Sequence, residues 1–161
     1  METRFISIWQ TTSANETITI PLRDGFDYNF TVDWGDGSAL SEVTSHDDSD
    51  TTHTYAAAGN HTITISGLIE TIYFNESGDK DKIISVPNLG DVGWTSFDSA
   101  FRGCSNLGNV VGGDTQKVTS MRYMFATASL VTPDTSGWDT SSVTDMGSMF
   151  SGTQNANPDT S

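Results

Sequence analysis

The chain has 161 residues, of which 21 are acidic and seven are basic, so its formal net charge at neutral pH is −14. This balance argues against nucleic-acid binding, because affinity for phosphates comes from lysine and arginine, and it disfavours attraction to an anionic membrane surface. No stretch is long and apolar enough to cross a bilayer, so we expect no membrane insertion. The single cysteine, Cys104, excludes an internal disulfide, and we expect it to be a small buried hydrophobe.

The first 66 residues contain short alternations of apolar and polar side chains, separated by turn residues. The clearest alternation runs from Tyr28 to Trp34 and ends at Gly35-Asp36-Gly37, where we expect the glycines to supply positive φ. Further strands are expected at residues 5–9, 17–20, 40–43, 52–55 and 61–66. Short strands with turn signals at regular intervals favour a β-sandwich.

One motif in this part is specific. Val32-Asp33-Trp34-Gly35-Asp36-Gly37-Ser38 is followed by His53-Thr54-Tyr55 and then by Ala58-Gly59. These residues resemble the pattern of PKD-type domains. The resemblance implies an immunoglobulin-like sandwich, common in extracellular proteins, over residues 1–66, and it gives His53 and His61 structural places.

Residues 67–93 connect this part to the rest of the chain. The apolar runs at residues 68–74 and 83–86 predict two strands around a turn at residues 78–82. We expect the segment to be an N-terminal cap that covers Trp94, Phe97 and Phe101 and holds the two parts together. A flexible linker is the poorer alternative, because linkers rarely carry so many aliphatic and aromatic residues.

The second half repeats itself. Val118 to Phe125 matches Val143 to Phe150 at a spacing of 25 residues, and Pro133-Asp134-Thr135-Ser136 recurs at residues 158–161. A weaker copy begins at Trp94. A fixed spacing of this size is typical of stacked repeats, and we expect units at residues 94–117, 118–142 and 143–161.

Each unit has the pattern of a short helix. Val143, Met146, Met149 and Phe150 would share one helical face, Ser142 and Asp145 would cap its start, and Gly152 would follow its end. The sequence therefore predicts a helix over residues 143–151 and a matching helix at the same place in each other copy of the unit. Because such a unit cannot bury its own apolar face, we expect Phe101, Phe125 and Phe150 to stack in one column.

The repeated motif resembles a known family. Val118-Thr119-Ser120-Met121-Arg122-Tyr123-Met124-Phe125, its copy at residues 143–150, and Trp138-Asp139-Thr140-Ser141-Ser142-Val143 resemble the BspA-type leucine-rich repeat. The resemblance implies a right-handed solenoid and a role in adhesion or binding at a cell surface. The expected fold class is therefore mainly β with short helices: an immunoglobulin-like sandwich followed by a leucine-rich-repeat solenoid. The chain stops inside a unit, so we expect a piece of a longer array, with an apolar end through which copies could associate.

The candidate sites differ in kind. No sequence motif for hydrolysis or nucleotide binding occurs and the three histidines all lie in the first part, so we expect no enzymatic activity. Positions that vary between units are candidate contacts, which gives Arg122 and Tyr123 as binding residues. Trp138, the one large apolar residue of its extended piece, is the third candidate. Calcium is the one candidate cofactor, because carboxylates suit hard cations. Its candidate ligands are Asp33, Asp36, Asp47, Asp48 and Asp50, and the alternative is that they bond their own turns or are solvated.

These observations lead to three functional expectations. The first is a binding or adhesion module at the cell surface or outside the cell, with a host or neighbouring-cell protein or glycan as partner and with export signal and anchor outside this chain. The second is an accessory region of a larger secreted enzyme, for instance one acting on polysaccharide. The third is a structural spacer.

Overall fold

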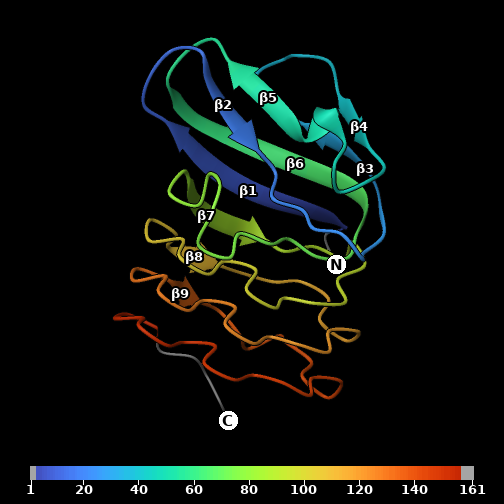
Figure 1. Ribbon diagram of the computed structural model, residues 1–161, viewed down its shortest axis with the longest axis vertical. Coiled ribbons are helices and arrows are strands. Elements are labelled where there is room, and N and C mark those ends of the chain that lie inside the picture. Colours follow the sequence, from blue (N-terminus) through green and yellow to red (C-terminus); the bar gives the residue numbers. More distant parts are fainter. Residues whose placement is uncertain (1–2, 157–161) are drawn as a thin grey trace.

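The computed structural model describes residues 3–156, and these residues are mainly β (Figure 1). A seven-stranded mixed sheet has the order β4-β3-β6-β1-β7-β8-β9, and β2 and β5 form a second, two-stranded sheet. The strands are β1 (Arg4–Thr11), β2 (Glu16–Thr19), β3 (Tyr28–Asp33), β4 (Ser41–Val43), β5 (Thr52–Tyr55), β6 (Gly59–Ile69), β7 (Ile83–Asn88), β8 (Asn109–Val110) and β9 (Thr132–Pro133). The only helix among the described residues is the one-turn 3₁₀ helix η1 (Ser49–Thr51).

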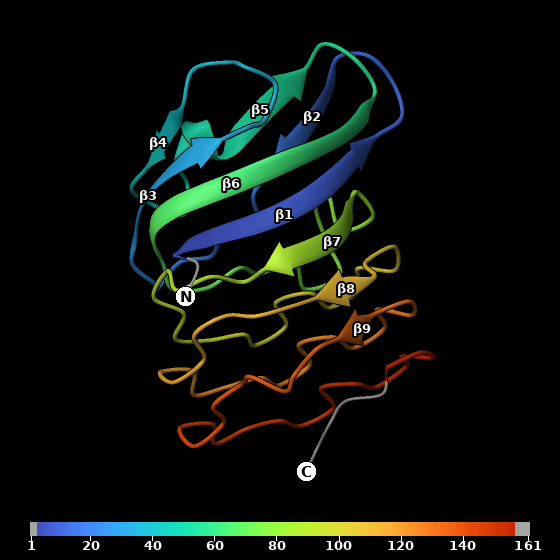
Figure 2. The same ribbon diagram turned by 180° about the vertical axis from the view of Figure 1, so that it is seen from behind.

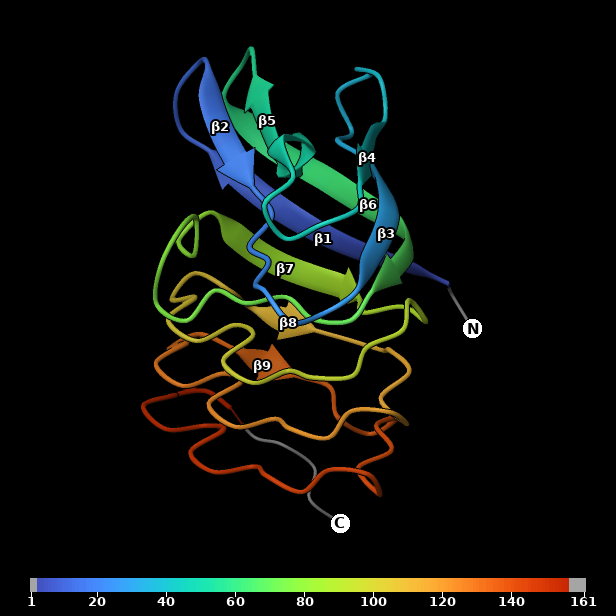
Figure 3. The same cartoon turned by 45° about the vertical axis from the view of Figure 1, so that its right-hand side comes forward.

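The N-terminal strands follow the predicted alternation closely. On β1, Phe5, Ser7, Trp9 and Thr11 are buried in alternation, because successive side chains of a strand point to opposite faces. The long strand β6 pairs antiparallel with β1 on one side and with β3 on the other. The small β2–β5 sheet lies over one face of the large sheet (Figure 3), so an apolar core forms between them.

The strands expected from the alternation up to residue 66 are all present, with shifts of a few residues at their ends. The turn at Gly35-Asp36-Gly37 also has the predicted left-handed glycines, with φ of 77° and 82°. A Cβ on Gly35 would lie 2.3 Å from the carbonyl oxygen of Thr62, so this position also requires the absence of a side chain. The strand expected at residues 68–74 was wrong beyond Ile69, where β6 ends.

From the end of β6 at Ile69 onward the chain forms layers that lie one below another (Figures 1 and 2). We call residues 69–92 layer 0, 94–117 layer 1, 118–142 layer 2 and 143–156 layer 3. Strand β7 of layer 0 pairs antiparallel with β1, and β7, β8 and β9 then pair in parallel. The large sheet therefore continues without interruption from the N-terminal strands into the layers.

A second ladder joins the layers at the opposite side. Alternate backbone N–H groups of one layer donate to carbonyl oxygens of the next layer, with N···O distances of 2.7–3.0 Å. The donors are Phe97, Ser99, Phe101 and Gly103 of layer 1 and Met121, Tyr123, Phe125 and Thr127 of layer 2. Most of the residues between them donate within their own layer to the carbonyl three residues earlier, as Met124 does to Met121, whereas Asp98 and Arg122 donate to the hydroxyl of the serine two residues earlier. Each layer edge is thus a run of overlapping turns in which every second N–H points to the next layer.

This pattern explains why the predicted repeat helix is wrong. Ser99, Tyr123 and Ser148 occupy the same place in successive layers and have φ of 54°, 53° and 56°, which is left-handed and interrupts any α-helix. Asp145 does not cap a helix, because its carboxylate accepts a bond from Gly147 N two residues on, at 2.8 Å. Gly152 is left-handed as expected, with φ of 74°, but it closes a turn.

The expected architecture therefore needs correction. The structure is not an immunoglobulin-like sandwich followed by a leucine-rich-repeat solenoid: no closed solenoid and no repeat helices occur in residues 3–156, and the second sheet has only two strands. What holds is the coarser expectation of a mainly β fold. The boundaries at residues 66 and 93 stay predictions. The recurrence of Pro133-Asp134-Thr135-Ser136 at residues 158–161 lies outside the described residues.

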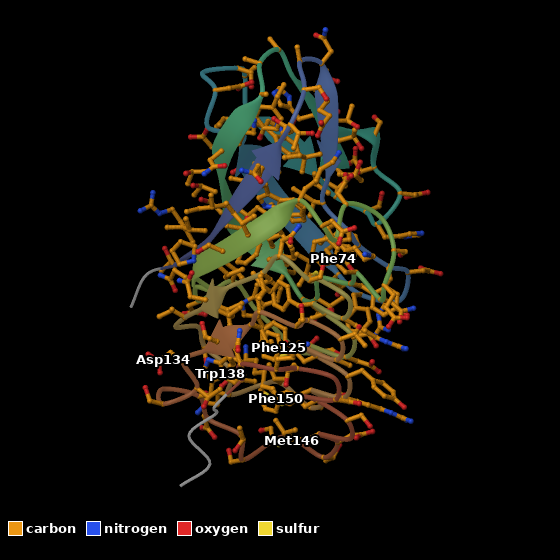
Figure 4. All side chains as sticks on the ribbon, turned by 90° about the vertical axis from the view of Figure 1, so that its left-hand side faces the viewer. Phe74, Phe125, Asp134, Trp138, Met146 and Phe150 are labelled. Atoms are coloured by element: carbon orange, nitrogen blue, oxygen red, sulfur yellow. The ribbon has the colours of Figure 1, made fainter. Side chains whose placement is uncertain are left out.

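The core of the layered part is a column of aromatic rings. Phe74, Phe101, Phe125 and Phe150 succeed one another from layer 0 to layer 3, and Figure 4 shows three of them one beneath another. Ring centroids are 5.8 Å apart between Phe101 and Phe125 and 5.7 Å apart between Phe125 and Phe150. The predicted column of Phe101, Phe125 and Phe150 is present, and Phe74 extends it to Trp9 of β1, at 5.6 Å.

Candidate functional site

The most distinctive surface group lies at the corner of layer 2, around Tyr123. The guanidinium carbons of Arg102 and Arg122 lie 5.0 and 4.9 Å from the centroid of the Tyr123 ring. Arg102 comes from layer 1 and Arg122 from layer 2, so stacking brings together side chains 20 residues apart. We call Arg102, Arg122 and Tyr123 the arginine–tyrosine corner.

The backbone holds this corner in a strained form. Tyr123 has a left-handed φ of 53°, which is unfavourable for a bulky residue and persists only where the surroundings determine it. Its N–H donates to the Gly147 carbonyl at 3.0 Å, and its own carbonyl accepts from Ala126 N at 3.1 Å. One of these bonds joins Tyr123 to layer 3 and the other lies within layer 2. Together they fix the direction in which the Tyr123 side chain leaves the layer.

Electrostatics couple the three side chains. Arg122 Nη2 donates to the Tyr123 hydroxyl at 3.3 Å, and this bond, together with the positive charge, lowers the pKa of Tyr123. Arg122 also lies 3.9 Å from the Asp145 carboxylate, and both side chains are about half exposed, so this pair contributes little stability. Arg102 Nε lies 3.4 Å from Glu76 Oε1 without hydrogen-bond geometry.

The predicted binding residues differ in how much of each side chain is free to contact a partner. Arg122 is exposed and Tyr123 is half-buried, but guanidinium groups lie against the Tyr123 ring. Trp138 is directed inward: its rings lie 6.4 Å from those of Phe97 and Phe125, and its Nε1 donates to the Gly112 carbonyl at 2.9 Å. Trp138 thus packs against the core between layers and is only partly exposed.

Sequence reasoning missed Arg102, because it lies in the weakest copy of the repeat and occupies a different place in the unit from Arg122. Its layer position alone gives no sign of the contact, since the side chain crosses to the next layer to reach Tyr123. A usable signal was that the chain has only seven basic residues and that Arg102 directly follows Phe101, the aligned phenylalanine of its unit.

Four of the five acidic residues proposed for calcium accept hydrogen bonds within local turns, and the fifth, Asp50, contributes its backbone N–H. Asp33 accepts from Gly35 N at 2.9 Å, and Asp36 accepts from Ser38 N at 3.0 Å and lies 2.7 Å from His53 Nε2. Asp47 accepts from the Ser45 hydroxyl at 2.8 Å. Asp48 caps η1 by accepting from Asp50 N at 3.0 Å. This is the turn-bonding alternative considered above.

Within residues 3–156, no group of three or more His, Cys, Asp or Glu side chains could hold a metal ion. Calcium binding therefore stays a prediction that the geometry of this loop region does not support. The bonds of Asp36 are instead structural: those from Ser38 and then His53 hold the pKa of its carboxyl well below the ordinary value. His53 in turn stacks on Trp34, with ring centroids 5.0 Å apart.

Comparison with known proteins gives one match. A family model described as "Mycoplasma protein of unknown function, DUF285" is similar to residues 95–161, which is less than half of the chain. No curated protein and no solved structure matches. The match and the absence of repeat helices overturn the resemblances proposed above: the repeated part is similar to this family of unknown function, and the pairing of a PKD-type domain with BspA-type leucine-rich repeats was wrong. No helix among residues 3–156 has the length and hydrophobicity needed to span a membrane.

Proposed function

We propose that the protein is a non-catalytic binding module that acts outside the cell or at a cell surface and presents the side of its layers to a protein or glycan partner. The observation that carries this proposal is the arginine–tyrosine corner. In a chain with a net charge of −14, two of the seven basic side chains converge on one half-buried aromatic ring. The backbone ladder holds that ring in a strained left-handed conformation, which gives the corner a fixed shape before any partner arrives.

The chemistry of the corner selects the partner. Guanidinium groups are planar and bind carboxylates through paired N–H donors, so the partner carries carboxylate groups. Sugar stacking on Tyr123 is disfavoured, because Arg102 and Arg122 already lie against its ring. An acidic protein segment or a glycan with carboxylate groups therefore suits the corner better than a neutral sugar. The acidic remainder of the surface would repel such a partner elsewhere and would direct it to this place.

The layers themselves supply a control variant. Layer 3 has Gly147 and Ser148 where layer 2 has Arg122 and Tyr123, and Ser148 adopts the same φ, 56°. The double variant Arg122→Gly/Tyr123→Ser therefore removes the corner and keeps a residue pair that this fold already accommodates. Its thermal unfolding should remain within a few degrees of the unmodified chain.

The test is a glycan-array and cell-binding screen with the unmodified chain and this double variant. We expect binding to acidic glycans or to cells that falls at least tenfold in the variant and weakens as salt is raised, because the contact is electrostatic. Binding that the variant retains would refute the role of the corner. If the unmodified chain binds nothing, the structural spacer becomes the better function. The accessory region of a secreted enzyme would be favoured by a catalytic domain encoded in the same gene.

A further inference from the structure

Arg23 is held in place where the N-terminal part meets layer 0. Its guanidinium carbon lies 4.8 Å from the centroid of the Phe26 ring and 4.4 Å from that of the Tyr73 ring. Its N–H donates to the Tyr28 hydroxyl at 3.3 Å, and this hydroxyl donates to the Arg23 carbonyl at 3.0 Å. Tyr73 N–H donates to the Pro21 carbonyl at 2.9 Å, which ties the loop of Arg23 to the edge of layer 0. We call Arg23, Phe26 and Tyr73 the Arg23 subsite.

The guanidinium group of this subsite has no carboxylate partner. Among residues 3–156, no Asp or Glu side chain lies within 4.0 Å of an Arg23 nitrogen, although the chain has 21 acidic residues. By contrast, Arg102 lies 3.4 Å from Glu76 and Arg122 lies 3.9 Å from Asp145. The Nε atom of Arg23 is buried, so the four N–H donors on its Nη atoms are the ones that remain for a ligand.

The Arg23 subsite lies on the same side of the layers as the arginine–tyrosine corner. Beside Tyr73 in layer 0, Asn75 N–H donates to the Ser99 carbonyl at 3.2 Å, and Ser99 N–H donates to the Arg122 carbonyl at 2.8 Å. Two hydrogen bonds therefore lead from this edge of layer 0 to Arg122 in layer 2. Because paired β segments lie about 4.8 Å apart, the subsite and the corner are separated by roughly 10 Å along the stack.

Two guanidinium sites at this spacing fit one kind of acidic ligand. A peptide in the polyproline II conformation has three residues per turn and rises about 3.1 Å per residue, so side chains three residues apart lie on one side, about 9 Å from each other. A glycan fits less well, because it would stack its sugar rings on aromatic faces. Guanidinium groups already lie over the rings of Tyr73 and Tyr123.

We propose that the partner is an acidic peptide segment that contacts both sites through carboxylates three residues apart; this inference rests on the proposed function of the corner. One carboxylate accepts from the Nη groups of Arg23, and the other accepts from Arg122. At the corner the ligand competes with Asp145, whereas at Arg23 it displaces no carboxylate of the described chain. Two contacts on one peptide reinforce each other, because the second forms at a high effective concentration.

The probe is a fluorescent peptide with three Glu-Pro-Pro repeats, titrated with the full chain at low salt and followed by anisotropy. We expect saturable binding at least tenfold tighter than that of the same peptide with Gln in place of two of its Glu residues, because that peptide engages one site at a time. Arg23→Gln should lower the affinity for the three-Glu peptide about tenfold and remove its advantage. Lys117→Gln is the matched control: it removes the same charge at an exposed position outside both sites, and it should change the affinity less than twofold.

Two further measurements separate a lost contact from a disturbed loop. Arg23→Lys keeps the charge on the same loop and should bind more tightly than Arg23→Gln. The affinity of Arg23→Gln should also fall less steeply with added salt than that of the unmodified chain, because one charge pair fewer is screened.

The outcomes distinguish this inference from the proposed function. Peptide binding that Arg23→Gln leaves unchanged would overturn the two-site contact, and its loss in Arg122→Gly/Tyr123→Ser would still support the corner. Absence of saturable peptide binding would overturn the acidic peptide as partner. So would an acidic glycan that binds more tightly than the peptide, although glycan binding that the double variant loses would leave the proposed function standing.

Discussion

Replacement of Phe125 tests the aromatic column at its centre. Phe125 is fully buried and lies between the rings of Phe101 and Phe150, at 5.8 and 5.7 Å. Trp138 adds a third ring at 6.4 Å. Phe125→Ala removes a buried ring and leaves a cavity between two layers that the ladder holds at fixed spacing, so we expect a loss of roughly 4 kcal/mol in the free energy of unfolding. That is a large part of the stability of a domain of this size.

The assay is equilibrium unfolding in urea at 25 °C, followed by tryptophan fluorescence and by circular dichroism. Phe150→Ala is the matched control: it removes the same side chain where one side of the ring is open, so it should cost only about 1–2 kcal/mol. Phe125→Leu, which keeps most of the volume, should cost less than Phe125→Ala. A Phe125→Ala variant that loses no more stability than Phe150→Ala would refute the column as the core of the layers.

Three further predictions concern single positions. Gly35→Ala should lower the free energy of unfolding by roughly 2 kcal/mol more than Gly25→Ala: both glycines are left-handed, but a Cβ at Gly35 would meet the Thr62 carbonyl whereas Gly25 has nothing within 4 Å. Equal losses in urea titrations would contradict this close approach. Asp36→Asn should destabilise the chain at neutral pH, and because the folded pKa of Asp36 is lowered, the difference from the unmodified chain should shrink as pH falls below about 4, the ordinary carboxyl value. A difference for Asp36→Asn that stays constant down to acid pH would argue against the bonds from Ser38 and His53. Cys104 is fully buried and burial raises the pKa of its thiol, so a thiol reagent at mildly alkaline pH should label it only at the rate of unfolding; rapid labelling of the native chain would contradict its place in the core.

The N-terminal strands were predictable because their information is local. The apolar residues Tyr28, Phe30 and Val32 alternate with polar ones, which directly indicates the buried face of the strand. The glycines at 35 and 37 indicate the turn. The 24- to 25-residue spacing likewise indicated which phenylalanines meet, because side chains in equivalent places of stacked layers lie together.

The conformation within each layer was not predictable from the apolar spacing. Met146, Met149 and Phe150 have the spacing of a helical face, but a run of overlapping turns brings residues three apart to the same side as well. Bonds between layers favour the turns over a helix. Every second N–H group of a layer edge donates to the next layer, whereas in a helix the same N–H group would donate within its own segment. Tertiary pairing thus overrode the local pattern, and the joined sheet from β1 to β9 depends on the same pairing.

The candidate site depended on contacts that sequence spacing does not encode. Arg122 and Tyr123 were found because they differ from Gly147 and Ser148 in the next copy. Arg102 could not be found in this way, since it reaches Tyr123 of the next layer from a different place in the unit. Trp138 packs against the core rings of Phe97 and Phe125 and stays partly exposed, so its role as a contact residue stays a prediction.

Amide hydrogen exchange of the unmodified chain tests the ladder between layers most directly. The account predicts strong protection at Met121, Tyr123, Phe125 and Thr127, whose N–H groups bond layer 3, and fast exchange at their counterparts Met146, Ser148, Phe150 and Gly152. The contrast should appear between residues of the same type, as between Phe125 and Phe150 or Met121 and Met146. Equal exchange in the two sets would contradict a ladder in which the N–H groups of layer 2 bond the carbonyls of layer 3.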